Sequence, residues 1–148
     1  MGYGPTGRTV ARLLRENGIA PTVIELNMDT VRTLRQEGVS AVYGDARDPA
    51  TLVIAGIRHA ATMIMSAAEA SATETIRAAR DLNPSVHVFA RSAYLRDVPA
   101  LRGCGAEHVF SGEGEVALAM TEAVLRRLGA TPDQIDRERQ RLRGELRA

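Results

Sequence analysis

The 148 residues suit one domain, or one domain with a short appendage, and suffice to bury a hydrophobic core without crosslinks. The net charge is +1 and the charges are mixed along the chain, which argues against the concentrated basic patch of a nucleic-acid-binding protein. The sequence has no lysine, which excludes a catalytic lysine, and its single cysteine, Cys104, excludes an intrachain disulfide.

The chain begins with a glycine-rich run, Gly2-Tyr3-Gly4-Pro5-Thr6-Gly7, of the form G-x-G-x-x-G. In dinucleotide-binding folds this run is the turn between a strand and a helix. A helix is predicted from Thr6 to Asn17, because apolar residues recur at helical spacing ahead of a glycine stop. The sequence shows no strand in front of the turn.

Strands and helices are then predicted to alternate. Apolar, largely β-branched runs between turn signals predict the strands 21–26, 39–43, 62–66, 86–91 and 107–110. Helical periodicity between caps and stops predicts helices at 29–37, from 48 onward, 70–82, 93–102 and 113–128. This alternation indicates a parallel sheet with crossover helices. Because the strands are nearly continuous apolar runs, both faces of the sheet are expected to be covered.

The last stretch of the chain has a different composition. Thr131-Pro132-Asp133-Gln134 has the pattern of a capping box with proline at the first helical position. The helix that follows, to about Arg147, is densely charged and has few apolar residues to bury. We therefore predict an α/β domain over 1–129 and a charged helical appendage over 130–148, which serves as a linker or a partner-binding element.

The glycine run predicts a phosphate site, because its backbone can approach a phosphate and the N–H groups of the following helix would face it. The candidate residues there are Gly2, Tyr3, Gly4, Pro5, Thr6 and Gly7. Glu25, at the end of the next strand, is placed to bond the adenine ribose hydroxyls, and an acid there favours NAD or an AMP-type ligand over NADP. The alternative for Glu25 is a solvated strand end.

Further candidates lie at the ends of later strands. Asp45, followed by Ala46, could approach the adenine or could cap the next helix. Ser66 could contact a phosphate or ribose, or could bond the backbone. Arg91 could reach a phosphate, an anionic effector or a neighbouring subunit, or could form a surface ion pair.

No catalytic residue or metal site is predicted. His59, His87 and His108 are scattered, and His87 is expected to be a hydrogen-bonded group of the core. The sequence has no nucleophile elbow and no Cys/His cluster with metal spacing, and Cys104 is interpreted as structural. Only two helices follow the fifth strand, which leaves no room for a substrate domain. A small NAD-dependent oxidoreductase, or a fragment of one, is the alternative function.

Taken in order, the segments GYGPTGR, TVIEL, VYGDARDPATL, VFARS and GAEHVFSGEGEVALAMTEAVLRRLG resemble the RCK-N or TrkA-N domain, a regulatory nucleotide-binding domain that controls potassium conductance. The resemblance covers roughly residues 2–129. It is closest to the domain on the cytosolic tail of Kef-type monovalent cation:proton antiporters, where a charged segment similar to 131–148 follows.

The resemblance implies a Rossmann-like, doubly wound fold that dimerises and binds NAD(H) or an adenine nucleotide (AMP, ADP or ATP) as an effector, without being an enzyme. It implies a cytoplasmic location at the inner face of the cell membrane, and as partner a membrane cation transporter, either on the same polypeptide or as a separate subunit. Carried over, the glycine turn would hold phosphate, Glu25 the ribose and Asp45 the adenine, and Arg91 matches a strand-end arginine. Glutathione gates some members, but Pro5 stands where those members often have a polar residue, which argues against that ligand here.

The resemblance also raises the question of a missing strand. In the strand order 3-2-1-4-5-6 the first strand is central, yet the glycine run begins at residue 2. Losing about four buried aliphatic side chains, at ~1.5–3 kcal/mol each, removes on the order of 6–12 kcal/mol, comparable to the stability of a whole domain. We therefore expect that a native strand precedes Met1, that another chain supplies it, or that the sheet is open beside Gly2-Tyr3-Gly4.

Overall fold

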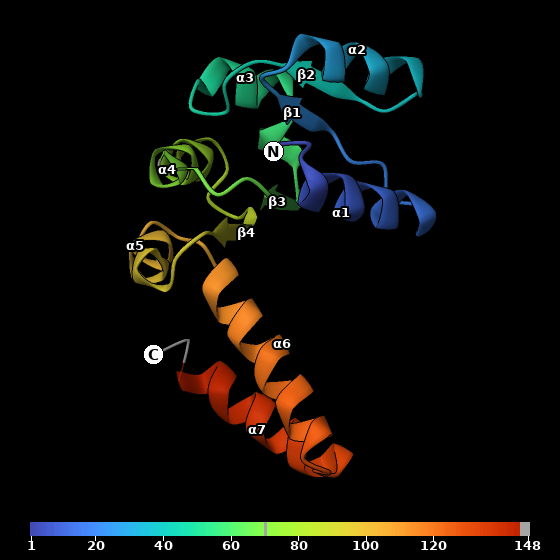
Figure 1. The fold of residues 1–148 in the computed structure, drawn as a ribbon. Coiled ribbons are helices and arrows are strands. Elements are labelled where there is room, and N and C mark those ends of the chain that lie inside the picture. The colour runs from blue at the N-terminus through green and yellow to red at the C-terminus, as the bar shows by residue number, and fades with distance from the viewer. Residues whose placement is uncertain (70, 146–148) are drawn as a thin grey trace.

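The computed structural model describes residues 1–69 and 71–145, in which helices alternate with short strands (Figure 1). The strands are β1 (Val23–Glu25), β2 (Ala41–Tyr43), β3 (Thr62–Met65), β4 (His87–Ser92) and β5 (His108–Ser111). The α-helices are α1 (Pro5–Glu16), α2 (Met28–Gln36), α3 (Pro49–Ile54), α4 (Ala72–Leu82), α5 (Val98–Gly103), α6 (Gly112–Arg127) and α7 (Pro132–Glu145). Two short 3₁₀ helices are η1 (Ile57–His59) and η2 (Leu95–Asp97).

The predicted order of elements is confirmed, with shifted boundaries. The strand expected over 21–26 is shorter, and the helix expected over 93–102 is divided into η2 and α5. Pro99 explains this division, because proline fits only in the first turn of an α-helix and therefore forces α5 to begin beside it. Position 70, in the helix predicted over 70–82, and positions 146–148, in the predicted appendage, lie outside the described residues.

All strand pairs are parallel, and they form two sheets in place of one. β1 pairs with β2, and β3, β4 and β5 follow one another in the second sheet. Within 1–69 and 71–145 this is the order of a Rossmann-like sheet with no strand between β1 and β3. The predicted fold class is therefore confirmed.

The first two residues lie between the two sheets. The N–H of Gly2 donates to the carbonyl oxygen of Ile24 on β1, at 3.0 Å. The amino group of Met1 donates to the carbonyl oxygen of Ile64 on β3, at 2.5 Å, and the N–H of Ser66 donates to Met1 O, at 3.1 Å. Met1 and Gly2 thus connect the sheets at the carboxyl ends of β1 and β3.

Two apolar clusters stabilise these layers. The larger one places α4 and α5 against one face of the β3–β5 sheet, where Ile76, Met63, Val88 and Leu101 are buried. In the smaller one, α2 packs Val31 and Leu34 against β1 and β2.

The expectation that both sheet faces are covered is wrong for β3–β5. Burial alternates along β4, where Val88, Ala90 and Ser92 are buried and the residues between them are partly or fully exposed. His87 belongs to the exposed side, so it is not the core group that was expected. Its Nδ1 lies 2.7 Å from Glu107 Oε2 at the surface. The apolar run at β4 resembled a fully buried strand because Phe89 on the open face is also apolar.

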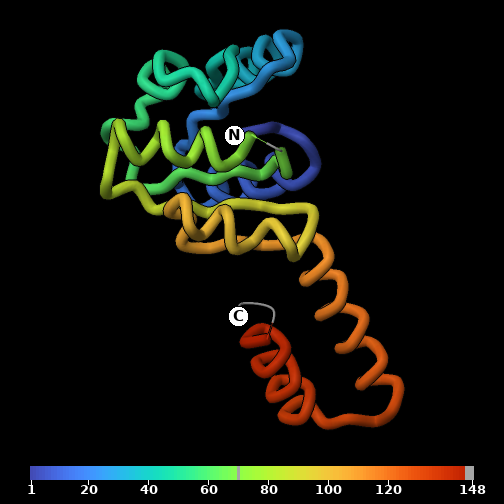
Figure 2. The backbone as a smooth tube through the Cα atoms, turned by 90° about the vertical axis from the view of Figure 1, so that its left-hand side faces the viewer, coloured from blue at the N-terminus to red at the C-terminus, as the bar shows by residue number. Residues whose placement is uncertain are grey.

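α6 and α7 extend away from the sheets, and α7 folds back beside α6 (Figures 1 and 2). The capping box is confirmed: Thr131 N donates to Gln134 Oε1, at 2.8 Å, and Gln134 N donates to Thr131 Oγ1, at 3.3 Å. Ile135 is buried, and Arg139 Nη2 donates to Glu122 Oε2 of α6, at 2.7 Å. No helix in the described ranges is long and apolar enough to cross a membrane.

Candidate nucleotide-binding site

The glycine turn is a close-packed junction between the start of α1 and the end of β3. Gly2 has a φ of +82°, a conformation that favours glycine, and Gly4 is the N-cap of α1. Gly7 is buried, and a Cβ there would collide with Gly2 O and approach Ser66 Oγ to 2.7 Å. The spacing of the first and third glycines is therefore a steric requirement of this turn.

The start of α1 offers unpaired backbone donors. Gly4 has no side chain to cap the helix, and the first helical hydrogen bond runs from Arg8 N to Gly4 O, at 2.9 Å. Within the part of the chain that the structure describes, the N–H groups of Gly4, Thr6 and Gly7 have no acceptor. Pro5, at the first helical position, and Thr6 are exposed beside them. This terminus of a 12-residue helix can receive an anion.

Glu25 is bound to the glycine turn and to its own loop. Its Oε2 accepts from Tyr3 N, at 2.7 Å, and its Oε1 accepts from Leu26 N, at 2.8 Å, and Asn27 N, at 3.0 Å. It is therefore not a freely solvated strand end. Each carboxylate oxygen accepts up to two hydrogen bonds, so Oε2 can still accept one from a ligand hydroxyl.

Asp45 faces the same edge from the end of β2. It accepts from the N–H of Arg47, at 2.8 Å, and from the Arg47 guanidinium, at 2.9 Å, and these hydrogen bonds lower the pKa of Asp45. α3 is capped by Asp48, which accepts from Ala50 N at 3.0 Å. The alternative that Asp45 caps this helix is therefore wrong, because the turn 45–48 places Asp48 next to the first helical residue.

A depression of about 40 Å³ joins several of the predicted residues at the carboxyl edge of β1, β2 and β3. The predicted residues that line it are Gly2, Glu25, Asp45 and Ala46. Sequence reasoning missed Leu26, Ala67 and Glu69, which also line it. Their position in the sequence could have identified them, because they follow the ends of β1 and β3. In a parallel sheet the loops after the carboxyl ends of the strands contact the ligand.

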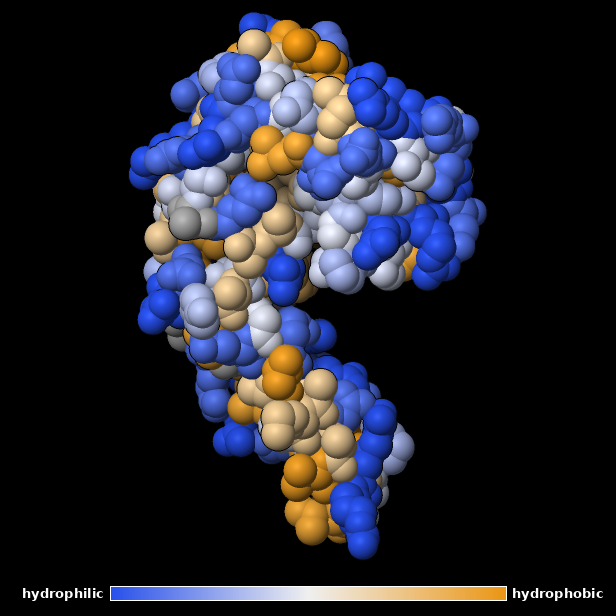
Figure 3. All heavy atoms as spheres, turned by 45° about the horizontal axis from the view of Figure 1, so that its top comes forward, coloured by the Kyte–Doolittle hydropathy of each residue, from blue (hydrophilic) through white to orange (hydrophobic). Residues whose placement is uncertain are grey.

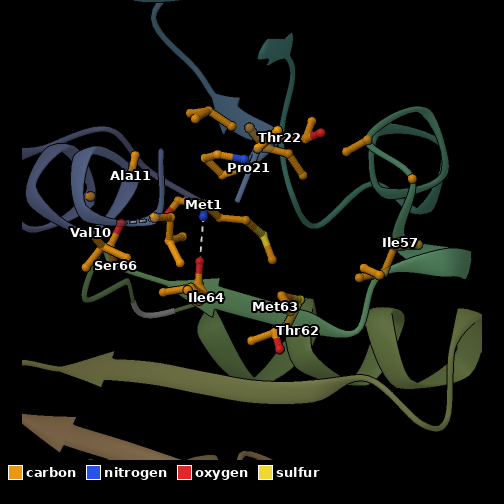
Figure 4. A pocket seen from close by; sticks show the side chains of 18 of the residues that line it. Met1, Val10, Ala11, Pro21, Thr22, Ile57, Thr62, Met63, Ile64 and Ser66 are labelled. Carbon is orange, nitrogen blue, oxygen red and sulfur yellow. Dashed lines mark hydrogen bonds between the residues drawn. The ribbon is translucent and has the colours of Figure 1, made fainter. Parts of the chain in front are cut away.

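Ser66 and Arg91 lie outside this depression. The Ser66 hydroxyl lies 2.8 Å from both Met1 O and Gly2 O, so it bonds the backbone of the glycine turn. It lines a larger cavity of about 670 Å³ between β1 and β3 (Figure 4). Arg91 is exposed on the open face of β4 beside Phe110, with no hydrogen bond or ion pair to any residue in 1–69 or 71–145.

The histidines have separate surroundings. His59 lines the larger cavity, His87 pairs with Glu107, and the ring of His108 stacks on Phe89 at 4.6 Å between centroids. Across the described residues, no three Asp, Glu, His or Cys side chains gather in a way that could hold a metal ion.

One family and two named antiporters have sequences similar to this chain. The family description "TrkA-N domain" matches residues 1–112. The chain is 32% identical over 123 residues to YbaL of Escherichia coli (strain K12), which is named as a putative cation/proton antiporter. This match covers 82% of this chain and 22% of YbaL. It is 31% identical over 125 residues to KefB of Alkalimonas amylolytica, which is named as a putative K⁺ efflux antiporter. That match covers 84% of this chain and 19% of KefB. The chain thus spans about a fifth of these relatives.

Solved structures share the fold. The TrkA-N domain of E. coli YbaL superposes with a TM-score of 0.80 at 32% identity, covering 82% of this chain and 91% of that one. The Kef C-terminal domain of Shewanella denitrificans in its AMP-bound form superposes with a TM-score of 0.79 at 21% identity, covering 99% of this chain and 92% of that one. The GsuK channel bound to NAD superposes with a TM-score of 0.67 at 25% identity, covering 73% of this chain and 20% of that one. The match over 1–112 and the identity to YbaL show that this chain belongs to the TrkA-N domain family.

Proposed function

We propose that this domain binds NAD(H) or an adenine nucleotide as an effector and regulates a potassium or other monovalent cation transporter. The observation that carries the proposal is the hydrogen bond between Tyr3 N and Glu25 Oε2, which joins the phosphate and ribose candidates in one unit. The relatives named as cation/proton antiporters, and the NAD bound to GsuK, support both parts of it.

The residues present fit an adenine nucleotide. Unpaired N–H groups at the start of α1 suit a phosphate, and the free lone pair of Glu25 suits a ribose hydroxyl. A 2′-phosphate would face the Glu25 carboxylate, so NAD(H) or AMP is favoured over NADP. Asp45, Ala46 and the exposed Leu26 border the depression where an adenine ring would follow.

An effector role is favoured over hydride transfer. The depression carries the carboxylates of Glu25, Asp45 and Glu69. Backbone N–H groups bond Glu25, and the Arg47 guanidinium bonds Asp45. Among the described residues that line the depression, there is no histidine, cysteine or tyrosine that could move a proton. The competing oxidoreductase function predicts oxidation of bound NADH in the presence of a carbonyl substrate. Absence of turnover together with binding would separate the two.

One apolar surface supports a homodimer. The side chains of Val116, Met120 and Val124 on α6, and of Leu128 at its C-cap, are exposed at four-residue spacing. Figure 3 shows apolar residues gathered on the extension that α6 and α7 form. Contiguous exposed apolar patches of this kind mark protein interfaces.

Regulation follows as a population shift between two dimer geometries. A nucleotide that joins the α1 terminus to the ends of β1 and β2 stabilises the arrangement in which these loops are together. The bias on the transporter can be no larger than the difference in nucleotide binding free energy between the two geometries. The transporter is proposed to lie on the same polypeptide, with this domain at the inner face of the membrane; a stand-alone sensor acting on a separate subunit is the alternative.

Isothermal calorimetry with NAD, NADH, AMP and ATP tests the nucleotide site. Saturable binding of at least one of them, with weaker binding of NADP, is expected. No heat from any of them would overturn the proposal. Light scattering tests the homodimer: Met120→Glu should give a monomer, whereas Arg137→Glu on the exposed face of α7 should leave the dimer intact.

A further inference from the structure

The carboxylate of Asp45, which lines the depression at the end of β2, is bonded at both of its oxygens by Arg47. Oδ1 accepts from the backbone N–H of Arg47, at 2.8 Å, and from its Nε, at 3.1 Å. Oδ2 accepts from the same Nε, at 2.9 Å, and from Nη2, at 2.5 Å. Because a carboxylate oxygen accepts up to two hydrogen bonds, these contacts fill the acceptor positions of Asp45.

Glu25, on the other side of the depression, differs in this respect. Within the described residues its Oε2 accepts one hydrogen bond, from Tyr3 N, so that a further position on this oxygen is open. Glu25 can therefore accept from a ligand hydroxyl without giving up a contact, whereas Asp45 can accept from a ligand only if Arg47 releases it.

The charge state of Asp45 adds a second restriction. The side-chain hydrogen bond from Arg47 is the main cause that lowers the pKa of Asp45, and the backbone hydrogen bond from Arg47 lowers it further. Asp45 is therefore ionised at neutral pH, and an ionised carboxylate has no proton to donate. While Arg47 is bound, Asp45 can neither donate to a ring nitrogen of a purine nor accept from its amino group.

The pair is part of a short turn. Arg47 lies two residues after Asp45, and Asp48 N donates to Asp45 O, at 3.1 Å, which closes the turn 45–48. The turn itself thus places the backbone N–H of Arg47 against Oδ1. A purine that covers the depression would displace water from Asp45, and the attraction between opposite charges is stronger where the local dielectric constant is lower. Opening the pair therefore costs more with the purine in place.

We propose that Arg47 determines the base specificity of the nucleotide site, because it occupies the acceptor positions with which Asp45 would otherwise read the 6-position of a purine. This inference rests on the proposed function. Recognition then depends on the ribose hydroxyl at Glu25 and on the phosphate at the start of α1, which purine ribonucleotides share. The ring contacts Leu26 and Ala67, whose apolar side chains form no hydrogen bonds with its edge.

Calorimetric titration with AMP and with purine riboside 5′-monophosphate tests the inference, because the second nucleotide lacks only the 6-amino group. The unmodified chain should bind the two with affinities within about threefold of each other. Arg47→Met frees Asp45, so this variant should prefer AMP by about tenfold or more, the effect of one hydrogen bond to a charged acceptor. Arg32→Met is the matched control, because Arg32 pairs with Asp29 within α2, at 3.5 Å, and should leave the ratio of affinities unchanged.

Asp45→Ala combined with Arg47→Met assigns the gained preference to Asp45. This double variant should again bind the two nucleotides within about threefold of each other, and circular dichroism checks that each variant is folded. A tenfold preference for AMP in the unmodified chain, no gained preference in Arg47→Met, or a preference that persists in the double variant would each overturn the inference and leave the proposed function intact. If the unmodified chain binds neither nucleotide, the proposed function fails and this inference fails with it.

Discussion

The carboxylate of Glu25 accepts a hydrogen bond from the backbone N–H of Tyr3 at 2.7 Å, although 22 residues separate them in the chain. The end of β1 and the glycine turn are thereby held as one rigid edge. A ligand that bonds Glu25 therefore finds the start of α1 already in a fixed position. This lowers the entropic cost of contacting Glu25 and the start of α1 at the same time.

The variant Glu25→Gln should bind the nucleotide about 10–100-fold more weakly, because it loses a charge-assisted hydrogen bond of ~1.5–3 kcal/mol. Calorimetry at constant salt measures this change. Glu37→Gln is the matched control, since Glu37 is exposed beyond α2 and outside the depression. Equal weakening by both variants would contradict a specific role of Glu25.

The two glycines at the ends of the G-x-x-G segment should respond differently to alanine. A Cβ at Gly7 would collide with Gly2 O, whereas a Cβ at Gly4 meets nothing within 4 Å. We expect Gly7→Ala to lower the free energy of unfolding by ~1–3 kcal/mol or more, and Gly4→Ala to change it by less than ~1 kcal/mol. Urea unfolding followed by circular dichroism measures both. Similar losses in the two variants would show that the Gly7 packing is not the cause.

The amino group of Met1 should make stability depend on pH. Its pKa is about 6 in the folded protein and 8.0 when exposed, so between these values the unfolded state binds more protons. The free energy of unfolding therefore rises with pH from about 6 to about 8, by ~2–3 kcal/mol in total. Urea unfolding at each pH measures it. N-terminal acetylation removes this group, and an acetylated protein with the same slope would refute the assignment.

The contact between α6 and α7 should weaken at low pH. Hydrogen bonding to Arg139 is the main cause that lowers the pKa of Glu122 below its ordinary value of 4.5, and Arg126 adds to it. A carboxylate with a lowered pKa stabilises the fold above its ordinary pKa, and this contribution disappears as the pH falls through the lowered value. Hydrogen exchange in α7 should therefore accelerate as the pH falls below about 4, beyond the intrinsic change in rate.

Glu122→Gln should reproduce this acceleration at pH 7 and remove the added pH dependence. Glu138→Gln is the control, because Glu138 pairs with Arg141 of the same helix, at 2.7 Å. If both variants accelerate exchange equally, the Glu122–Arg139 contact does not hold the two helices together.

The order of strands and helices, the glycine turn and the positions of Glu25 and Asp45 could be read from the sequence, because they depend on local periodicity and turn chemistry. The capping box at Thr131 is equally local. The burial of His87 was predicted wrongly, because an apolar run does not show whether a helix covers each face of its strand.

The sequence by itself determined the alternation of elements and hence a parallel α/β fold, since caps, stops and apolar spacing act within a few residues. Only the tertiary structure decided that the sheet is divided in two, that Ser66 bonds the glycine turn and that Arg91 lies on an open face away from Glu25. These relationships join residues from about 20 to 65 positions apart in the chain. They depend on which strand edges and sheet faces another element packs against, and no local sequence pattern encodes this.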